Sequence, residues 1–259
     1  LAAVKAGAIV IDNNSDLDGM SESDIDAAAA AAKADGKPGK WELPLQNTTQ
    51  QPYLASLKNR DVRKRIFEAS WNRAERGDSN DTRKTITRLA QLRAQKAKLL
   101  GFPNYAAWNL QDQMAKTPEA VNNFLTQLIP PTMAKGKEEA ADIQALIKSQ
   151  GDTFQVQPWD WDYYSEQVRK AKYDLDESQV KPYFVLDSVL QNGVFYAANQ
   201  LYGITFKERK DLPVWQKDVR VFEVFDKDGS SLALFYCDYF KRDNKAGGAW
   251  MSNMVNQST

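Results

Sequence analysis

The residue types that carry most enzyme chemistry are scarce in this chain of 259 residues: it has no histidine and one cysteine, Cys237. Without histidine the chain holds no triad with a histidine base, no histidine-based zinc site and no histidine pH switch. Any catalysis by these residues alone would depend on carboxylates, Lys, Tyr or Cys237. A single cysteine forms no disulfide within the chain, which favours a cytoplasmic location.

The segment "NSDLDGMSESDI" (14–25) resembles a calcium-binding loop. Asn14, Asp16 and Asp18 occupy alternate positions, and Gly19 occupies the sixth. The twelfth position, where calcium loops carry a bidentate Glu, is Ile25. Because that carboxylate is missing and the first position is Asn, we interpret the segment as a solvated turn before a capped helix.

The segment "WDWDYY" (159–164) clusters aromatic rings with two carboxylates. Such a cluster can form a stacking platform for a base or a sugar. It is also typical of a helix start, where acidic residues interact favourably with the helix dipole and aromatic residues pack inward. The second interpretation is favoured because the charges fall in the expected first turn.

Two features near the end of the sequence have ordinary structural interpretations. Cys237 lies in an alternating segment with no basic neighbour, so we predict a structural thiol rather than a nucleophile. The segment "KRDNKAGG" (241–248) is basic but lacks the glycine spacing of a phosphate-binding loop, and no helix follows it. We predict a turn of solvated charges there.

Hydrophobic periodicity predicts mostly helices over the first two hundred residues. Segments 59–78 and 80–103 form two amphipathic patterns around a Gly-Asp-Ser-Asn link, which predicts an antiparallel helical hairpin. The last predicted helix carries Pro182 and Gly193, which favour a kink or a break. The other predicted helices cover 21–35, 105–114, 117–131, 132–150 and 157–174.

After Gly203 the pattern changes to the period of two that is typical of strands. Strands are predicted in 204–209, 219–226, 231–240 and 248–255, with a hairpin turn at Asp228-Gly229 between the middle two. The predicted fold class is therefore mainly α with a small C-terminal antiparallel or mixed β-sheet. We predict a helical portion over 1–203 and a sheet domain that starts at 204 and continues to 259.

Composition excludes several classes of partner. The chain has 34 basic and 34 acidic residues, so its overall charge attracts neither nucleic acid nor an anionic membrane. Its 7 Trp, 10 Tyr and 11 Phe favour a packed core over disorder. The apolar runs are too short to span a bilayer, and the first residues lack a signal-peptide pattern.

The segment "LALFYCDYFKRDNKAGGAWM" (232–251) is the most distinctive stretch of the chain. Further distinctive segments occur in order along nearly the whole chain: "PLQNTTQQP" (44–52), "NRAERGDSNDTR" (72–83), "LLGFPNYAAW" (99–108), "MAKTPEAV" (114–121), "QPWDW" (157–161) and "LDESQVKPYF" (175–184). Together these segments resemble the thimet oligopeptidase family of zinc oligopeptidases, in particular its bacterial peptidyl-dipeptidase branch.

The resemblance implies part of a neurolysin-like zinc oligopeptidase fold, mostly helical, with two lobes around a deep channel. In that family a His-Glu-x-x-His helix and a further Glu bind one zinc ion, and zinc-bound water attacks the peptide bond. The family motif would lie a little past Thr259, so we expect this chain to be a catalytically silent fragment without a zinc site. The parent protein is then expected to be a cytoplasmic metallopeptidase, a hydrolase that releases C-terminal dipeptides from short peptides.

One segment of this chain matches a part of the family that borders the channel, and it comprises Gly247, Gly248, Ala249, Trp250 and Met251. The resemblance implies that its backbone contacts extended peptide substrate, since two glycines allow close approach. The alternative is an ordinary strand in which the glycines form a bulge. We expect the parent protein to be a monomer and the fragment to self-associate.

A different class of function also fits a mostly helical chain: a non-catalytic module that binds peptides or proteins and never held a metal. The sequence downstream of Thr259 in the parent gene would separate the two hypotheses, because only the peptidase requires a His-Glu-x-x-His helix there.

Overall fold

The computed structural model describes residues 2–45, 50–174, 177–242, 245, 251–253 and 255. The chain forms two compact units, Leu1–Tyr173 and Asp174–Thr259, and each is considered by itself. The first unit is mainly helical, the second combines a broken helical segment with strands, and each contains a small antiparallel sheet. The predicted fold class, mainly α with a small sheet, is confirmed. Among the described residues, no helix is both long and apolar enough to cross a bilayer.

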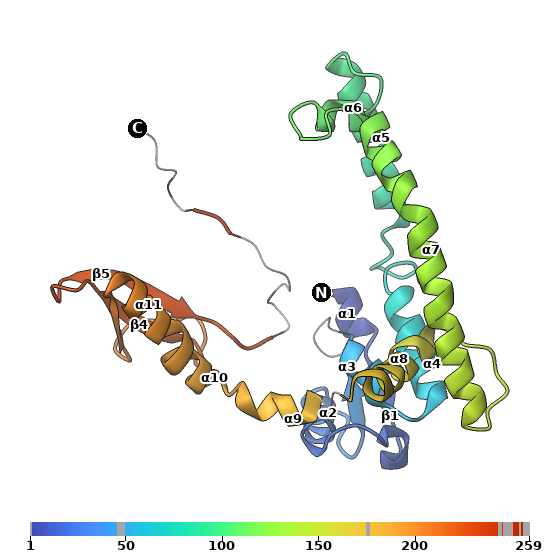
Figure 1. The fold of residues 1–259 in the computed structure, drawn as a ribbon, viewed down its shortest axis with the longest axis horizontal. Coiled ribbons are helices and arrows are strands. Elements are labelled where there is room, and N and C mark those ends of the chain that lie inside the picture. Colours follow the sequence, from blue (N-terminus) through green and yellow to red (C-terminus); the bar gives the residue numbers. More distant parts are fainter. Residues whose placement is uncertain are drawn as a thin grey trace. The chain divides into compact units, whose positions relative to one another are not determined.

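The first unit begins with a small core around two short strands (Figure 1). Strands β1 (Ile9–Ile11) and β2 (Trp41–Leu43) pair antiparallel, and helix α2 (Glu22–Ala34) packs on β2. Ser21 caps α2 by accepting the amide N–H of Asp24 at 3.2 Å, as its Ser-x-x-Asp pattern predicts. β1 was not predicted, because three residues are too few to show a period. Two short helices complete this region, α1 (Ala2–Ala6) and the 3₁₀ turn η1 (Asn14–Leu17).

Two further helices close this core, α3 (Gln50–Ser56) and α4 (Arg60–Trp71). The side chain of Asn59 caps α4 by accepting the amide N–H groups of Asp61 and Val62. The apolar stripe of α4 points into the core, where Val62 and Ile66 are buried. The buried residues of this core are Ile11, Leu17, Ala28, Leu43, Leu45, Tyr53, Leu54, Leu57, Val62, Ile66 and Ala69.

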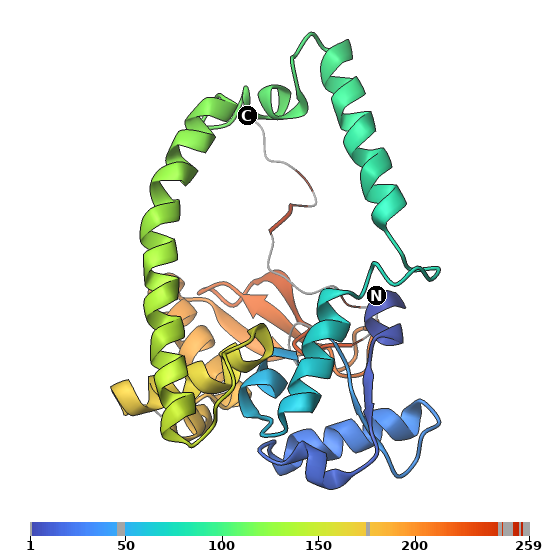
Figure 2. The same ribbon diagram turned by 90° about the vertical axis from the view of Figure 1, so that its right-hand side faces the viewer.

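The predicted helical hairpin over 59–103 is wrong. Helix α4 ends at Trp71 rather than at Gly77, so residues 72–82 form a long connection to α5 (Arg83–Leu99). Figure 2 shows α5 leading away from α4 rather than folding back against it. The apolar stripe of α5, which includes Ile86, Leu89 and Leu92, is consequently exposed.

Helix α6 (Tyr105–Leu110) is followed by α7 (Pro118–Ser149), a single helix of 32 residues where two were predicted. Thr117 caps α7 through the amide N–H of Ala120, and Pro118 occupies its first position, where a missing N–H costs nothing. The helix continues through Pro130 and Pro131, although neither proline can donate a backbone hydrogen bond. Helix α8 (Pro158–Tyr173) then packs against α3, α4 and α7.

The second unit begins with a broken helical segment in place of one long helix, as Pro182 and Gly193 favour. Helix α9 (Glu177–Val180) ends in the 3₁₀ turn η2 (Lys181–Tyr183) at Pro182. The helical path resumes as α10 (Leu186–Ser188), widens to π-helical turns in η3 (Val189–Phe195) around Gly193, and ends as α11 (Tyr196–Tyr202). Gly203 stops it with φ +75°, the left-handed conformation that glycine adopts without strain.

A three-stranded antiparallel sheet follows in the order β3 (Thr205–Glu208), β4 (Arg220–Phe225), β5 (Ser231–Cys237). The predicted hairpin at Asp228-Gly229 joins β4 to β5, and Gly229 has φ +82°. The η3 helix packs on this sheet through Phe195, whose ring stacks on Phe206 with centroids 3.9 Å apart. The core of this unit is formed by Leu190, Phe195, Phe222 and Cys237.

Our domain boundary after Gly203 follows the change from helix to strand, whereas the compact units divide after Tyr173. Helices α9 to α11 therefore group with the sheet. As a boundary between functional domains, position 203 stays a prediction.

Candidate functional site

The predicted peptide-contact segment, Gly247–Met251, falls mostly outside the described residues. Gly247, Gly248, Ala249 and Trp250 are not described, so neither peptide contact nor a glycine bulge is tested. Met251 is described, and its side chain is 95% exposed. Residues 251–253 are not part of a strand, so the predicted strand 248–255 is wrong for these three positions. An isolated extended segment forms no ladder hydrogen bonds unless another strand pairs with it.

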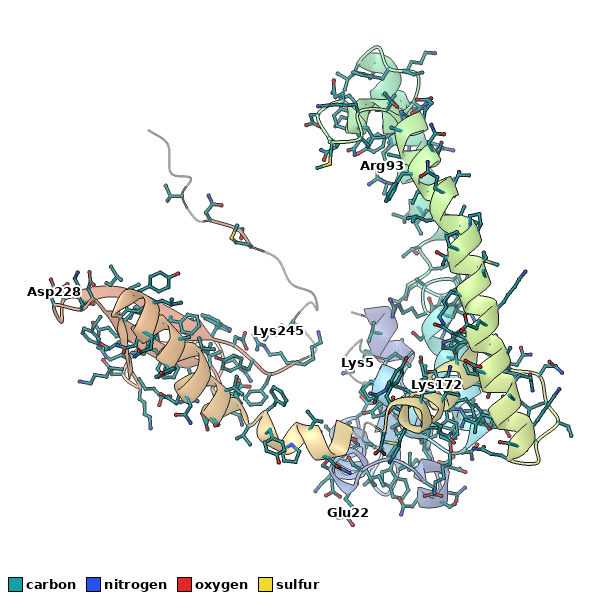
Figure 3. The ribbon with its side chains drawn as sticks, in the orientation of Figure 1. Lys5, Glu22, Arg93, Lys172, Asp228 and Lys245 are labelled. Atoms are coloured by element: carbon teal, nitrogen blue, oxygen red, sulfur yellow. The ribbon has the colours of Figure 1, made fainter. Side chains whose placement is uncertain are left out.

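The described residues show how the chain leaves the sheet toward this segment. Strand β5 pairs with β4 along one side, while its own side chains from Ser231 to Phe235 are exposed. The strand ends at Cys237, which is buried in the core of the sheet unit. Figure 3 shows Asp228 at the tip of the hairpin and Lys245 on the chain that leaves the opposite end of β5.

A cluster of polar side chains surrounds the residue after β5, and we call Asp238, Trp215, Arg242 and Lys245 the Asp238 cluster. Arg242 donates from Nη1 to Oδ1 of Asp238 at 2.7 Å and from Nη2 to Oδ2 at 2.8 Å. The indole N–H of Trp215 donates to Oδ2 at 3.1 Å, and Lys245 Nζ lies 3.2 Å from Oδ1. The Arg242 guanidinium holds the pKa of the Asp238 carboxyl well below its usual range, and Trp215 and Lys245 lower that pKa further.

These contacts bear on the basic segment 241–248. Arg242 and Lys245 are paired with Asp238, and Lys245 Nζ also donates to the carbonyl of Phe240 at 3.2 Å. The ammonium group of Lys241 donates to the carbonyl oxygen of Lys245. The described cations of this segment are thus bound within the turn, which supports a turn rather than a phosphate-binding loop. The roles of Trp215 and Asp238 were not predicted, because neither residue forms a motif with the basic segment.

The aromatic segment 159–164 starts helix α8, as the favoured interpretation predicts. Asp160 is fully buried in its first turn. Its carboxylate accepts both Nε and Nη2 of Arg60 at 2.9 and 2.8 Å, and Nη2 of Arg63 at 3.2 Å. Arg63 is itself buried and also donates to the carbonyls of Leu57, Lys58 and Trp159. This cluster joins α4 to α8 and leaves its carboxylate no room for a ligand.

An apolar pocket lies beside this helix start and was not predicted. It encloses about 690 Å³ and is lined by Phe67, Trp71, Val156, Gln157, Pro158 and Trp161. Phe67 and Trp71 stack with ring centroids 5.6 Å apart. The lining residues come from two segments separated in sequence, so periodicity alone could not bring them together. The pocket has no titratable group in its lining, which makes it unsuited to acid–base chemistry.

The segment that resembles a calcium loop is occupied by protein side chains. Asp16 accepts the side-chain amide of Asn59 at 2.8 Å, and Asp18 accepts the ammonium group of Lys58 at 3.0 Å. A Cβ on Gly19 would lie 2.1 Å from the carbonyl oxygen of Ser56, so only glycine fits this turn. The segment is a turn that docks on the end of α3, in agreement with the favoured interpretation.

Within the described parts of the chain, no group of three or more Cys, Asp or Glu side chains is arranged to hold a metal ion. Cys237, the one thiol, is buried among Leu190, Phe195 and Phe222. A soft-ligand zinc site requires several Cys or His residues, so the residues present here do not fit zinc.

Comparison with known proteins identifies the family. The family described as Peptidase family M3 matches residues 53–259, so the chain belongs to this family. Over all 259 residues it is 56% identical to the dipeptidyl carboxypeptidase of Escherichia coli (strain K12) and covers 38% of that relative.

Two further relatives define the range of similarity. The dipeptidyl carboxypeptidase of Salmonella typhimurium is 54% identical over the whole chain, which again covers 38% of the relative. Oligopeptidase A of Escherichia coli is 36% identical over 96% of the chain and 37% of the relative. The chain thus spans less than two-fifths of the length of these curated relatives. The predicted resemblance to peptidyl-dipeptidases of the zinc oligopeptidase family is confirmed.

Proposed function

We propose that this chain is part of a zinc metallopeptidase that releases dipeptides from the C-termini of short peptides. The observation that carries the proposal is the 56% identity to a dipeptidyl carboxypeptidase over the entire chain. Identity to the oligopeptidase A of the same organism is 36%, so the similarity favours the dipeptide-releasing branch. Family membership also favours a peptidase over a non-catalytic helical module.

In this proposal the chain supplies substrate contact and no catalytic group. It has no histidine, and its only cysteine is buried in an apolar core, so zinc ligands must come from other parts of the protein. One zinc ion bound there would polarise the peptide carbonyl and activate water. The isolated 259-residue chain is then inactive.

The peptide-contact segment in this proposal is Gly247–Met251. Its two glycines carry no Cβ, so a peptide backbone can approach it closely. Extended peptides commonly bind by adding a strand to an open edge, which uses main-chain hydrogen bonds and is tolerant of side-chain sequence. The exposed side chain of Met251, outside any strand, is consistent with a backbone that another strand can still pair with.

The proposed partner is a short peptide. Equal numbers of acidic and basic residues give no electrostatic reason for binding nucleic acid or an anionic membrane. We propose that the complete protein is a monomer. We also propose that it is cytoplasmic, because one cysteine and no disulfide suit a reducing compartment.

The test is product analysis with the complete protein and an N-acetylated tetrapeptide that has a free C-terminal carboxylate. The expected products are a C-terminal dipeptide and an N-acetylated dipeptide, with loss of activity on chelation and recovery with zinc. Cleavage only at internal bonds of longer peptides would contradict the dipeptide-releasing activity. The isolated chain serves as a second sample. Peptide hydrolysis by it, or one tightly bound zinc ion per isolated chain, would contradict the proposal that this chain contains neither the zinc site nor the catalytic groups.

A further inference from the structure

Helix α5 carries a dense positive charge, although the net charge of the whole chain is zero. Residues 83–111, which span α5 and α6, contain no Asp or Glu. Their six basic residues all lie on α5 and are all exposed: Arg83, Lys84, Arg88, Arg93, Lys96 and Lys98. Arg83 pairs with Asp81 just before the helix, whereas the other five form no ion pair with the described residues. This surface therefore attracts a negatively charged partner, which the chain as a whole does not.

Two of these cations are held in place by aromatic rings of α6. The guanidinium carbon of Arg93 lies 5.1 Å from the ring centroid of Tyr105, and Nζ of Lys96 lies 3.9 Å from that of Trp108. Arg93 lies near the end of α5 that leads to α6 (Figure 3). A ring attracts a cation without accepting its N–H hydrogen bonds as a carboxylate does. Both cations are thus oriented, while their N–H groups can still donate to a carboxylate.

The face of α5 that carries these two cations also carries exposed apolar side chains. Leu89, Leu92, Arg93 and Lys96 occupy positions i, i+3, i+4 and i+7, so they lie on one side of the helix. The two leucine side chains are 45% and 44% exposed. A partner that covers this side must offer apolar side chains next to carboxylates. An amphipathic helix with acidic residues beside its apolar stripe meets both requirements.

Two other kinds of anionic partner fit this side of α5 less well. An anionic bilayer would take the leucines into its apolar interior, and Arg93 and Lys96 would have to be buried with them. Single-stranded nucleic acid stacks its bases on open aromatic rings. Tyr105 and Trp108 each already hold a cation, and their planes are tilted by 49° to one another. The combination of apolar and charged groups therefore favours a protein partner.

We propose that one side of α5 is a docking surface for an acidic amphipathic helix of another protein. We call it the α5 face, and it consists of Leu89, Leu92, Arg93 and Lys96. The leucines pack against the apolar stripe of the partner helix, and the two cations bind carboxylates at the border of that stripe. Because the rings of α6 already orient these cations, less side-chain entropy is lost on binding. The α5 face requires neither zinc nor a peptidase site, so this inference goes beyond the proposed function and does not depend on it.

The experiment measures binding to the complete protein by fluorescence anisotropy. The probe is a fluorescein-labelled peptide of about 18 residues, built from Glu, Leu and Ala with leucine at helical spacing. Its ends are acetylated and amidated, so it lacks the free C-terminal carboxylate on which the proposed peptidase activity depends. The peptide is expected to bind the unchanged protein, and its Kd is expected to rise with salt concentration because salt screens exposed charges.

Variants at Lys96 separate the α5 face from overall charge. Lys96→Gln is expected to raise the Kd about fivefold by removing one exposed ion pair with the probe. Lys135→Gln is the matched control, because it removes the same charge from an exposed position on α7, and its Kd is expected to stay within about 1.5-fold. Lys96→Arg keeps the charge and is expected to stay within about threefold of the unchanged protein. Glutamine is a good helix former, so α5 is expected to remain folded in Lys96→Gln.

Three results would overturn the inference. The first is that the complete protein does not bind the acidic peptide at low salt. The second is an equal loss of affinity in Lys96→Gln and Lys135→Gln, which would assign binding to overall charge. The third is tighter binding of phosphatidylglycerol vesicles or of oligothymidylate than of the peptide, which would identify a surface for lipid or nucleic acid. A complete protein that hydrolyses no peptide would contradict the proposed function alone, since this binding is measured without catalysis.

Discussion

At the scale of single residues, three carboxylates in the described part of the chain are bound by cations of the protein. Asp160 binds Arg60 and Arg63, Asp238 binds Arg242, and Asp18 binds Lys58. A carboxylate that is paired in this way is held in one orientation by its partner, so it is poorly placed to act as a general acid or base. These three carboxylates therefore organise the structure of the chain.

The first prediction concerns the buried cluster. Asp160→Asn is expected to destabilise the first unit by about 3–5 kcal/mol, because it leaves the buried guanidinium of Arg63 without its carboxylate. Arg63 is 1% exposed and cannot regain solvent without unfolding α4 from α8. Urea unfolding followed by circular dichroism measures the change. Glu138→Gln is the control, since its pair with Lys135 on α7 is largely exposed and its loss should leave the midpoint unchanged. Equal midpoints for both variants would contradict the prediction.

The second prediction concerns backbone contact at Ala249. If the segment Gly247–Met251 pairs with peptide, Ala249→Pro removes one donor and fixes φ, whereas Ala249→Ser leaves the backbone unchanged. In the complete protein, Ala249→Pro is expected to lower kcat/KM about tenfold or more, and Ala249→Ser to change it less than about threefold. Thermal melting is measured in parallel, so that disruption of the fold is recognised. Full activity of Ala249→Pro at an unchanged melting temperature would show that peptide does not use this backbone.

At the scale of elements, several helix starts were predictable, whereas helix partners were not. Ser21, Asn59 and Thr117 cap helices through local hydrogen bonds, which depend only on neighbouring residues. The hairpin at Asp228-Gly229 is local in the same sense. By contrast, the predicted packing of α4 on α5 failed, because an amphipathic stripe shows that a face is apolar but not what covers it.

The same limit applies to the candidate site. The Asp238 cluster joins Trp215 to residues more than twenty positions later, and the pocket beside α8 joins α4 to the start of α8. Such contacts depend on tertiary packing, so no local sequence pattern predicts them. The identity of the family could be recognised from the sequence because ordered motifs survive along the whole chain, whereas the geometry of Gly247–Met251 stays a prediction.

The third prediction tests the glycine that ends the helical segment before the sheet. Gly203 adopts φ +75°, and a Cβ there would lie 3.2 Å from Cβ of Lys227. Gly203→Ala is expected to destabilise the second unit by about 1–2 kcal/mol, the usual cost of a left-handed alanine. Gly193→Ala is the matched control, because φ there is not positive and no atom lies within 4 Å of the added methyl group. The control is expected to keep or raise stability. Thermal unfolding of both variants measures the difference, and a more stable Gly203→Ala variant would refute it.

At the scale of the whole molecule, the described chain leaves long apolar stripes uncovered. Helix α7 exposes Phe124, Leu125, Leu128, Ile129 and Met133, which recur at helical spacing along one face. Exposed apolar area of this extent is unusual for a stable monomer and is typical of interfaces. The relatives are more than twice as long as this chain, so additional protein is available to cover such surfaces in them.

The last prediction follows from these stripes. The isolated chain is expected to self-associate, because burying leucine and isoleucine side chains releases roughly 25 cal/mol for each Å² removed from water. Sedimentation velocity over a range of concentrations should show a rising weight-average mass. Leu128→Lys is expected to reduce this association by placing a charge in the middle of the α7 stripe. Glu138→Gln is the control, since it changes the net charge of α7 by the same +1 at an exposed position outside the stripe. A mass that stays monomeric at every concentration would exclude association, and equal reduction by both variants would assign it to net charge rather than to the apolar stripe.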